Sequence, residues 1–241
     1  MNIACWSGPR NLSTALMYAF GARPDCAVWD EPFYATYLDR TGIDHPMRDE
    51  IIAAGLTDWA EVARRCTAPD PEGAAHLYLK LMTHHVLDGD SLDWAAKAAH
   101  VFLIRHPARV LASYAVKREN PDLADIGFAQ QSAIFQTVRA RGWRYAVIDS
   151  NDIRRAPESA LRALCDAIDL PFDPTMLSWP AGGHAGDGVW AAHWYDAVHR
   201  STGFAGAEGP MPAVDPALSA VHDAALPHYQ QMRAETLRIP A

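Results

Sequence analysis

Short runs of apolar residues recur along the chain, and longer stretches of mixed polarity separate them. The runs span residues 3–6, 27–29, 77–82, 101–104 and 145–148. Runs this short are typical of strands that are buried on both faces of a parallel sheet, where crossover helices join one strand to the next. We therefore predict an α/β fold built on an open parallel sheet.

Helical patterns fill most of the intervening stretches. Helices are predicted over residues 12–20, 59–65, 108–118, 128–141 and 158–168, and the tail over 216–238 is also predicted to be helical. Helices that alternate with the strands of a parallel sheet cover both of its faces. The expected architecture therefore has three layers, with the sheet sandwiched between helices.

Two stretches depart from this alternation. Residues 34–71 have mixed polarity and several turn residues, which suits a lid insertion that closes over a site. Residues 180–204 begin with a glycine-rich stretch and include Trp190, Trp194 and Tyr195, so we predict a mobile loop that contacts a cofactor or substrate. The length of 241 residues suits a single domain over residues 1–241.

Composition narrows the classes of partner. A formal net charge of −8 argues against a protein that neutralises nucleic-acid phosphates over a broad surface, so we expect no nucleic-acid partner. The chain has no run of about 18 apolar residues, so we expect no membrane partner. The sequence assigns no oligomeric state.

The cysteines and histidines indicate the compartment and the absence of a metal. The four cysteines stand far apart, without the close pairs that bind zinc or form a redox dithiol, and no secretory leader precedes them. We therefore expect reduced thiols in a cytoplasmic protein. The histidines show no His-Glu-x-x-His arrangement, and we assign no metal site.

An anion-binding loop is predicted directly after the first strand. There the chain turns through Gly8 and Pro9 and opens a helix with hydroxyl side chains. Backbone N–H groups at a helix start favour bound anions, and an arginine adds charge-assisted hydrogen bonds. An ordinary capped turn is the alternative, but it explains only one hydroxyl. The residues predicted to bind phosphate are Arg10, Asn11, Leu12, Ser13 and Thr14.

This loop differs from that of the nucleoside triphosphatases. It lacks the Gly-Lys-Ser/Thr sequence, and no strand-end aspartate completes a magnesium site. A magnesium-dependent kinase is therefore the less favoured interpretation.

A second anion-binding element follows the fourth predicted strand. Arg105 stands at the carboxyl end of that strand, and Ser113 follows eight residues later in a predicted helix. Ligands of open α/β sheets bind at the carboxyl ends of the strands. The alternative is that Arg105 forms a structural ion pair and that Ser113 is a surface residue.

Together the two elements resemble the 3′-phosphoadenylyl sulfate-dependent sulfotransferases, which have a P-loop-type fold. The first loop of that family has a proline, a lysine or arginine, and then small and hydroxyl residues that open a helix. Pro9, Arg10, Ser13 and Thr14 fit this pattern, and Leu12 stands where many members carry glycine. The resemblance implies that the protein moves a sulfuryl group from 3′-phosphoadenylyl sulfate to a hydroxyl or amine of a small-molecule acceptor, with adenosine 3′,5′-bisphosphate as the product.

The resemblance also implies which residues hold the 3′-phosphate of the cofactor. The matching arginine and serine of the family have this role, which we carry to Arg105 and Ser113. The family covers the same phosphate with a basic, glycine-containing loop near the carboxyl end, and residues 182–184 or 199–203 are the candidates here. We choose Arg200, because it is permanently cationic.

Sulfuryl transfer needs a group that stabilises the leaving phosphate and a base that removes the acceptor's proton. Arg10 suits the first role. Glu31 suits the second, because it directly follows the second predicted strand and some sulfotransferases carry a general-base glutamate there. Asp30 is the rival, but adjacent residues of an extended segment point in opposite directions, so we expect only one of them to face the site. Glu31 could instead cap a helix or pair with an arginine.

Two further catalytic candidates follow from the third predicted strand. Other sulfotransferases place a lysine and a catalytic histidine at its end, and Lys80 with His84 is similar in kind though not in spacing. Lys80 would contact the sulfuryl oxygens, and His84 the acceptor or the base. The alternative is that each forms ordinary structural hydrogen bonds.

Two other functions stay open from the sequence. The first is a P-loop phosphotransferase that uses a nucleoside triphosphate, which predicts a magnesium requirement. The second is a noncatalytic nucleotide-binding module, which predicts binding without turnover.

Overall fold

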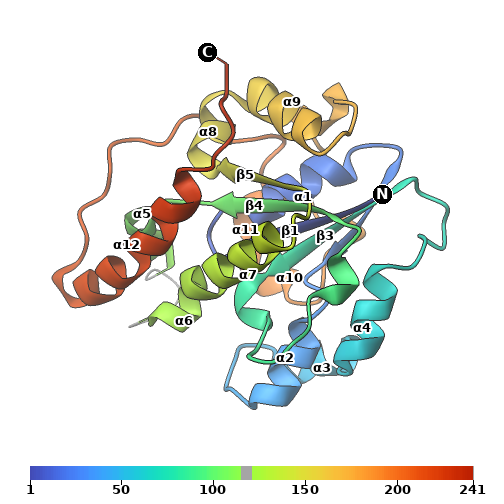
Figure 1. Cartoon of the computed structure of the whole chain (residues 1–241), viewed down its shortest axis with the longest axis horizontal. Coiled ribbons are helices and arrows are strands. Elements are labelled where there is room, and N and C mark those ends of the chain that lie inside the picture. The colour runs from blue at the N-terminus through green and yellow to red at the C-terminus, as the bar shows by residue number, and fades with distance from the viewer. Residues whose placement is uncertain (115–120, 241) are drawn as a thin grey trace.

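Five parallel strands form the centre of the computed structural model, which describes residues 1–114 and 121–240 (Figure 1). They are β1 (Asn2–Ser7), β2 (Cys26–Asp30), β3 (His76–Met82), β4 (Ala99–Ile104) and β5 (Tyr145–Asp149), arranged in the order β2-β3-β1-β4-β5. Each predicted apolar run lies inside one of these strands. The prediction of an open parallel sheet is confirmed.

The strand register brings the carboxyl ends of the strands to one edge. Ser7 at the end of β1 lies opposite Met82 of β3 and Leu103 of β4. The chain leaves β1 towards β2 and β3, and then crosses to β4 on the other side. The loop after β1 therefore lies where the strand order reverses, which is the usual ligand position in an open α/β sheet.

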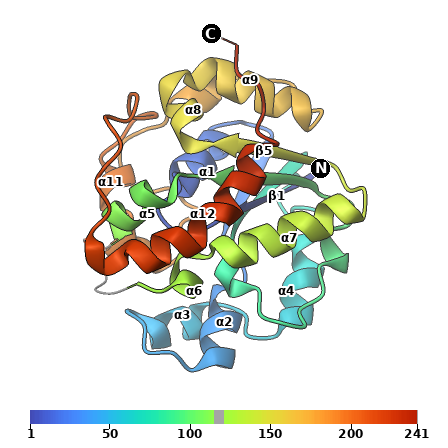
Figure 2. The same ribbon diagram turned by 60° about the vertical axis from the view of Figure 1, so that its left-hand side comes forward.

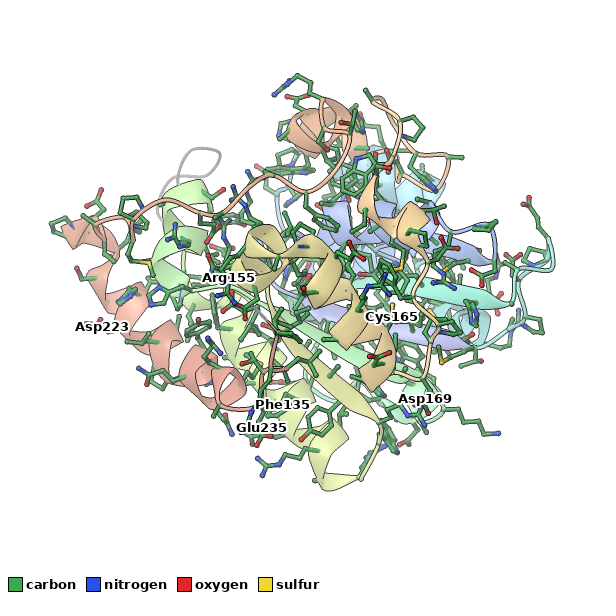
Figure 3. The ribbon with its side chains drawn as sticks, turned by 90° about the horizontal axis from the view of Figure 1, so that it is seen from above. Phe135, Arg155, Cys165, Asp169, Asp223 and Glu235 are labelled. Carbon is green, nitrogen blue, oxygen red and sulfur yellow. The ribbon has the colours of Figure 1, made fainter. Side chains whose placement is uncertain are left out.

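Helices cover both faces of the sheet. One face is covered by α1 (Ser13–Gly21), α8 (Ser150–Arg155) and α9 (Pro157–Ala167), together with the 3₁₀ helix η3 (Pro174–Leu177). In α9, Ala160, Leu161, Leu164 and Cys165 recur at helical spacing and are all buried, which gives this helix its inward face. Figure 3 shows α9, which carries Cys165, lying over the strands.

The other face is covered by α4 (Trp59–Cys66), α5 (Pro107–Tyr114), α7 (Phe128–Ala140) and α12 (Ser219–Arg233). Figure 2 shows α7 and α12 crossing in front of the sheet. The short α6 (Leu123–Ile126) precedes α7, and η2 (Asp93–Ala95) and η4 (Pro216–Leu218) are 3₁₀ turns on this side. The predicted three-layer arrangement is confirmed.

A third apolar cluster lies beyond the carboxyl edge of the sheet. It joins α2 (Tyr34–Thr41) and α3 (Arg48–Ala54) to α10 (Ala191–Trp194), and α11 (Asp196–His199) follows directly. Residues 34–71, which were predicted as one lid, therefore belong to two different parts of the structure. The first two helices of this range belong to this cluster, whereas α4 packs on the sheet face as an ordinary crossover helix.

The helix predicted over residues 216–238 is longer than the helix that the structure contains. The tail begins with η4, α12 then ends at Arg233, and Leu237 donates its backbone N–H to the carbonyl of Val147 at 2.9 Å. The last residues extend along β5 because its outer edge offers unpaired backbone groups. The predicted helix over residues 108–118 is confirmed up to Tyr114, and its remainder lies outside the described residues.

Two further observations concern the cysteines and the helices. All four cysteines are free thiols and are buried. None of the helices in the described part of the chain is both long and apolar enough to cross a membrane.

Candidate functional site

The loop after β1 has an unusual backbone. Arg10 and Leu12 have φ values of 64° and 73°, in the left-handed region that glycine tolerates best. Gly8 allows close packing, because a Cβ atom there would lie 2.5 Å from the carbonyl oxygen of Ile126. Many members of the family that this chain resembles carry glycine at the position of Leu12, and this positive φ explains why. In this chain the same conformation costs about 1 kcal/mol of strain, because leucine has a Cβ atom.

The loop presents the start of α1 to the carboxyl edge of the sheet. Leu12 precedes the helix, and no side chain among the described residues caps it. Its first-turn N–H groups are therefore available to an anion. Asn11 fixes the loop to β4, because its buried side-chain amide donates to the carbonyl of Leu103 at 3.3 Å. Ser13 is buried and Thr14 is half-buried in the same turn.

Three of the predicted cofactor-binding residues meet beside this loop. Arg10 donates from Nε to the hydroxyl of Ser113 at 2.9 Å, and Arg105 donates from Nη1 to the backbone carbonyl of Arg10 at 2.7 Å. Burial lowers the pKa of Arg10, and the charge of Arg105 lowers it further. Cations held this close to one another favour a bound anion.

An acidic side chain pairs with this cationic group. The carboxylate of Glu208 is 1% exposed and forms an ion pair with Arg105 of β4's carboxyl end. Its oxygens also lie 2.8 Å from Nε of Arg109 on α5 and 3.2 Å from Nη1 of Arg154 on α8. Three elements thus place three arginines around one carboxylate.

A second polar group lies at the ends of β2 and β3. The ammonium group of Lys80 lies 2.9 Å from Oδ1 of Asp30 and 2.5 Å from Oε1 of Glu31. The hydroxyl of Tyr195 contacts all three side chains, at 2.5 Å from Nζ of Lys80 and 2.8 Å from Oδ2 of Asp30. Trp190 donates its indole N–H to this hydroxyl at 3.0 Å. The segment before α11 therefore closes over the strand ends.

Burial and neighbouring charges together set the pKa values of Glu31 and Lys80. Burial raises the pKa of Glu31, even though the positive charge of Lys80 lies beside it. Burial by itself would lower the pKa of Lys80, but the two carboxylates raise it instead. Lys80 is therefore a fixed cation that holds both carboxylates in place.

The expectation that Asp30 and Glu31 point in opposite directions is wrong. Both carboxylates reach Lys80. The reason is that Glu31 has a φ of 41°, so the chain turns at this residue and does not continue as an extended strand. Glu31 therefore pairs with a lysine, where pairing with an arginine was the alternative, and its role as a base stays a prediction.

The histidines follow in η1 (Thr83–His85). His84 packs edge-on against Tyr37, with ring centroids 5.6 Å apart. His85, which the sequence did not single out, lies closer to the acidic group, with Nε2 3.9 Å from Oε2 of Glu31. Its ring stacks between Tyr34 and Tyr37, and burial lowers its pKa well below the usual value.

The comparison with family models decides what kind of protein this is. Residues 1–236 match the model described as a sulfotransferase domain. The chain belongs to the sulfotransferase domain family. The match includes the loop after β1 and the arginines around Glu208. It also includes the lysine group, which consists of Lys80, Asp30, Glu31 and Tyr195.

Curated relatives of this sulfotransferase domain come from a plant. The branched-chain-amino-acid aminotransferase-like proteins 1 and 2 of Arabidopsis thaliana are 38% and 36% identical to it over 202 residues, which is 84% of this chain. The chain spans 36% of the length of each relative. Their names therefore describe proteins much longer than the matched part.

Solved structures show the same fold. The sulfotransferase domain of the olefin synthase from Synechococcus PCC 7002 covers 93% of this chain, and this chain covers 94% of it, with a TM-score of 0.51 and 22% identity. The sulfotransferase domain from the curacin biosynthetic pathway covers 99% of this chain, with 92% of its own length matched, a TM-score of 0.51 and 16% identity. These likenesses bear on the fold alone.

One predicted residue of the sulfotransferase site stands apart from the others. Arg200 follows α11 and is exposed. Within residues 1–114 and 121–240, no hydrogen bond or ion pair joins it to Arg10, Arg105 or Ser113. Its proposed contact with the 3′-phosphate stays a prediction.

Five residues of these two polar groups were not predicted: Tyr195 as a polar partner, His85, Arg109, Arg154 and Glu208. Arg109 follows Arg105 by four residues, and this helical spacing is the signal that could have identified it. Tyr195 and Glu208 come from irregular segments far along the chain, where the sequence carries no comparable signal.

Proposed function

We propose that this sulfotransferase domain is an enzyme that moves a sulfuryl group from 3′-phosphoadenylyl sulfate to a hydroxyl or amine of a small molecule. The observation that carries the proposal is the meeting of Arg10, Ser113 and Arg105 beside the start of α1, at the point where the strand order reverses. The four buried, free thiols support a reducing, cytoplasmic setting for the reaction.

The chemistry of these residues fits the sulfuryl donor. A bisphosphate needs cations and hydrogen-bond donors at two places, one for each phosphate. This edge of the sheet offers two such places. Arg10 and the first-turn N–H groups of α1 would bind the 5′-phosphosulfate, while Arg105 and Ser113 would bind the 3′-phosphate. The buried carboxylate of Glu208 on Arg105 supports the fit, because it is an anion held at the second place.

In the proposed reaction, the acceptor oxygen or nitrogen forms a bond to sulfur, and the bond from sulfur to the bridging oxygen breaks with its electron pair going to the 5′-phosphate. Arg10 stabilises the charge that develops on that oxygen, an effect of about 3 kcal/mol for one well-placed hydrogen-bond donor. The acceptor's proton goes to the carboxylate of Glu31.

The lysine group supports Glu31 in this role. Lys80 and Tyr195 hold one carboxylate oxygen of Glu31, and His85 lies beside the other. We therefore propose that Lys80 positions the base, in place of the contact with sulfuryl oxygens that the resemblance suggests. The raised pKa of Glu31 makes it a stronger base than an ordinary glutamate.

Donor consumption tests this function directly. The protein is incubated with 3′-phosphoadenylyl sulfate and pools of small hydroxyl and amine compounds, and adenosine 3′,5′-bisphosphate is measured by chromatography. We expect at least one pool to produce the bisphosphate together with a sulfated acceptor, and Arg10→Ala to abolish both. Phosphorylated products formed from ATP and magnesium would contradict the proposal.

A further inference from the structure

Glu208 lies on a segment that the arginines hold in place. Residues 204–215, here called the strap, contain neither helix nor strand and run down to the start of η4 and α12 on the left of Figure 1. Arg109 donates to the carbonyl of Gly209 at 2.5 Å, and Arg154 donates to the carbonyl of Gly206 at 2.9 Å. The same arginines that surround the carboxylate therefore also fix the backbone of the strap.

Among the residues that the structure describes, the charges of this group do not balance. The side chain of Glu208 is 1% exposed and contributes one negative charge, whereas Arg105, Arg109 and Arg154 contribute three positive charges. Arg10 lies next to them through its carbonyl contact with Arg105. The three arginines are half-buried, and cations that are partly removed from water favour close counter-charges. A phosphate monoester, with close to two negative charges at neutral pH, would balance them better than one carboxylate.

The hydrogen bonds of the group are also incomplete. Among the described residues, Nε of Arg105 and Oε2 of Glu208 are buried without a hydrogen-bond partner. Oε2 lies 2.8 Å from Nε of Arg109, so it forms an ion pair there, but not with the alignment of a hydrogen bond. A guanidinium group presents its donors as a planar fork, which the oxygens of a phosphate match in pairs. The three oxygens of a phosphate would accept more hydrogen bonds from these arginines than the two oxygens of a carboxylate.

We infer that Arg109 and Arg154 join Arg105 in binding the 3′-phosphate of the sulfuryl donor, and that Glu208 occupies this site as an internal carboxylate that the phosphate displaces. The inference rests on the proposed function, because it assigns further residues to the same donor site. Displacement frees the strap. The apparent affinity for the donor equals the intrinsic affinity multiplied by the fraction of molecules in which Glu208 has left the arginines. A nucleotide without a 3′-phosphate leaves Glu208 in place.

The test compares two substitutions that the inference predicts to act in opposite directions. Calorimetric titration with adenosine 3′,5′-bisphosphate should show binding at least about threefold tighter for Glu208→Gln, because the competitor is lost. Binding should be about tenfold weaker for Arg154→Gln, because a charged hydrogen bond is lost. Adenosine 5′-monophosphate should bind both variants as it binds the wild type.

The exposed pair Glu158 and Arg162 on α9 gives matched controls. Glu158→Gln and Arg162→Gln make the same chemical changes away from the site and should leave bisphosphate affinity unchanged. A purely structural salt bridge between Glu208 and Arg154 predicts weaker binding in both site variants, and that result would overturn the inference. An unchanged affinity in Glu208→Gln would also overturn it while leaving the proposed function intact, whereas a wild type that binds no bisphosphate would overturn the function as well.

Hydrogen exchange on the wild-type protein gives the same test without a substitution. We expect adenosine 3′,5′-bisphosphate, but not adenosine 5′-monophosphate, to speed amide exchange in the strap. Unchanged or slower exchange of the strap with saturating bisphosphate would show that Glu208 stays on its arginines.

Discussion

Lys80 shows how a single residue can organise several polar side chains at the carboxyl edge of the sheet. Its ammonium group is buried and lies on two carboxylates and a tyrosine hydroxyl, which come from the end of β2 and from the segment before α11. Charges are buried at this depth only when they are paired. The group therefore depends on each of its members.

Replacing Lys80 should destabilise the fold strongly. Lys80→Met leaves Asp30 and Glu31 buried without their cation, and the loss of one partner of a buried ion pair costs about 3–5 kcal/mol. Urea unfolding measures this change. The exposed Lys97 provides a control, because Lys97→Met should change stability by less than about 0.5 kcal/mol. Equal effects of the two substitutions would contradict the pairing.

Replacing Glu31 separates binding from chemistry. Glu31→Gln keeps the size of the side chain and removes the proposed base, so turnover should fall by about 100-fold or more while bisphosphate affinity stays unchanged. Because burial raises the pKa of Glu31, wild-type turnover should rise with pH through a value above that of an ordinary glutamate. A pH–rate profile measures this rise. A variant that retains turnover would show that Glu31 is not the base.

The sequence identified residues that come together beside the start of α1, but it did not predict their contacts. The sequence predicted two anion-binding elements, one with Arg10 and one with Arg105 and Ser113, and these three residues meet in the structure. The turn at Glu31 was missed because a positive φ in a non-glycine residue leaves no mark in the sequence. Glu208 was missed for a related reason, since an irregular segment has no periodicity that would place it.

At the scale of the elements, β4 is tied to its surroundings by a buried histidine. His100 accepts a hydrogen bond at Nδ1 from the indole of Trp6 at 3.0 Å, and its Nε2 lies 3.1 Å from the carbonyl of Ala95. This pair of contacts requires a neutral ring, with the proton on Nε2. Burial lowers the pKa of His100 to about 4.

His100 should therefore make stability depend on pH. Between pH 6.5 and 4 the unfolded chain binds a proton that the folded protein excludes, so stability falls as the pH decreases, by about 1.4 kcal/mol per pH unit from this residue. Above pH 6.5 the contribution is constant. Urea unfolding of the wild type and of His100→Asn at pH 7, 6 and 5 measures the difference in slope. Parallel curves for the two proteins would contradict this assignment.

The elements that could be predicted were those with a strong apolar pattern. All five strands and the crossover helices have it, because they are buried against the sheet. The tail was predicted as one helix to residue 238, whereas the chain leaves α12 and pairs with the edge of β5. Pairing with an exposed sheet edge depends on where the fold ends, which local sequence does not reveal.

At the scale of the whole molecule, the sheet order explains why the site forms. The loop after β1 lies between β3, which carries Lys80 near its end, and β4, which Arg105 directly follows. We propose that the donor binds on one side of β1, beside Arg105, and that the base lies on the other, beside Lys80. This arrangement requires the chain to place β2 and β3 on one side of β1 and β4 on the other. The site therefore depends on the whole fold and not on any one motif.

The central claim is that this edge of the sheet binds the bisphosphate of a sulfuryl donor. Calorimetric titration of the purified protein with adenosine 3′,5′-bisphosphate, and separately with ATP and magnesium, tests it without knowledge of the acceptor. We predict tight binding of the bisphosphate and little response to ATP, because Arg105 and Ser113 would serve only the 3′-phosphate. A preference for ATP with magnesium would contradict the account in favour of phosphoryl transfer, and no binding of either nucleotide would contradict it in favour of a fold that has lost its ligand.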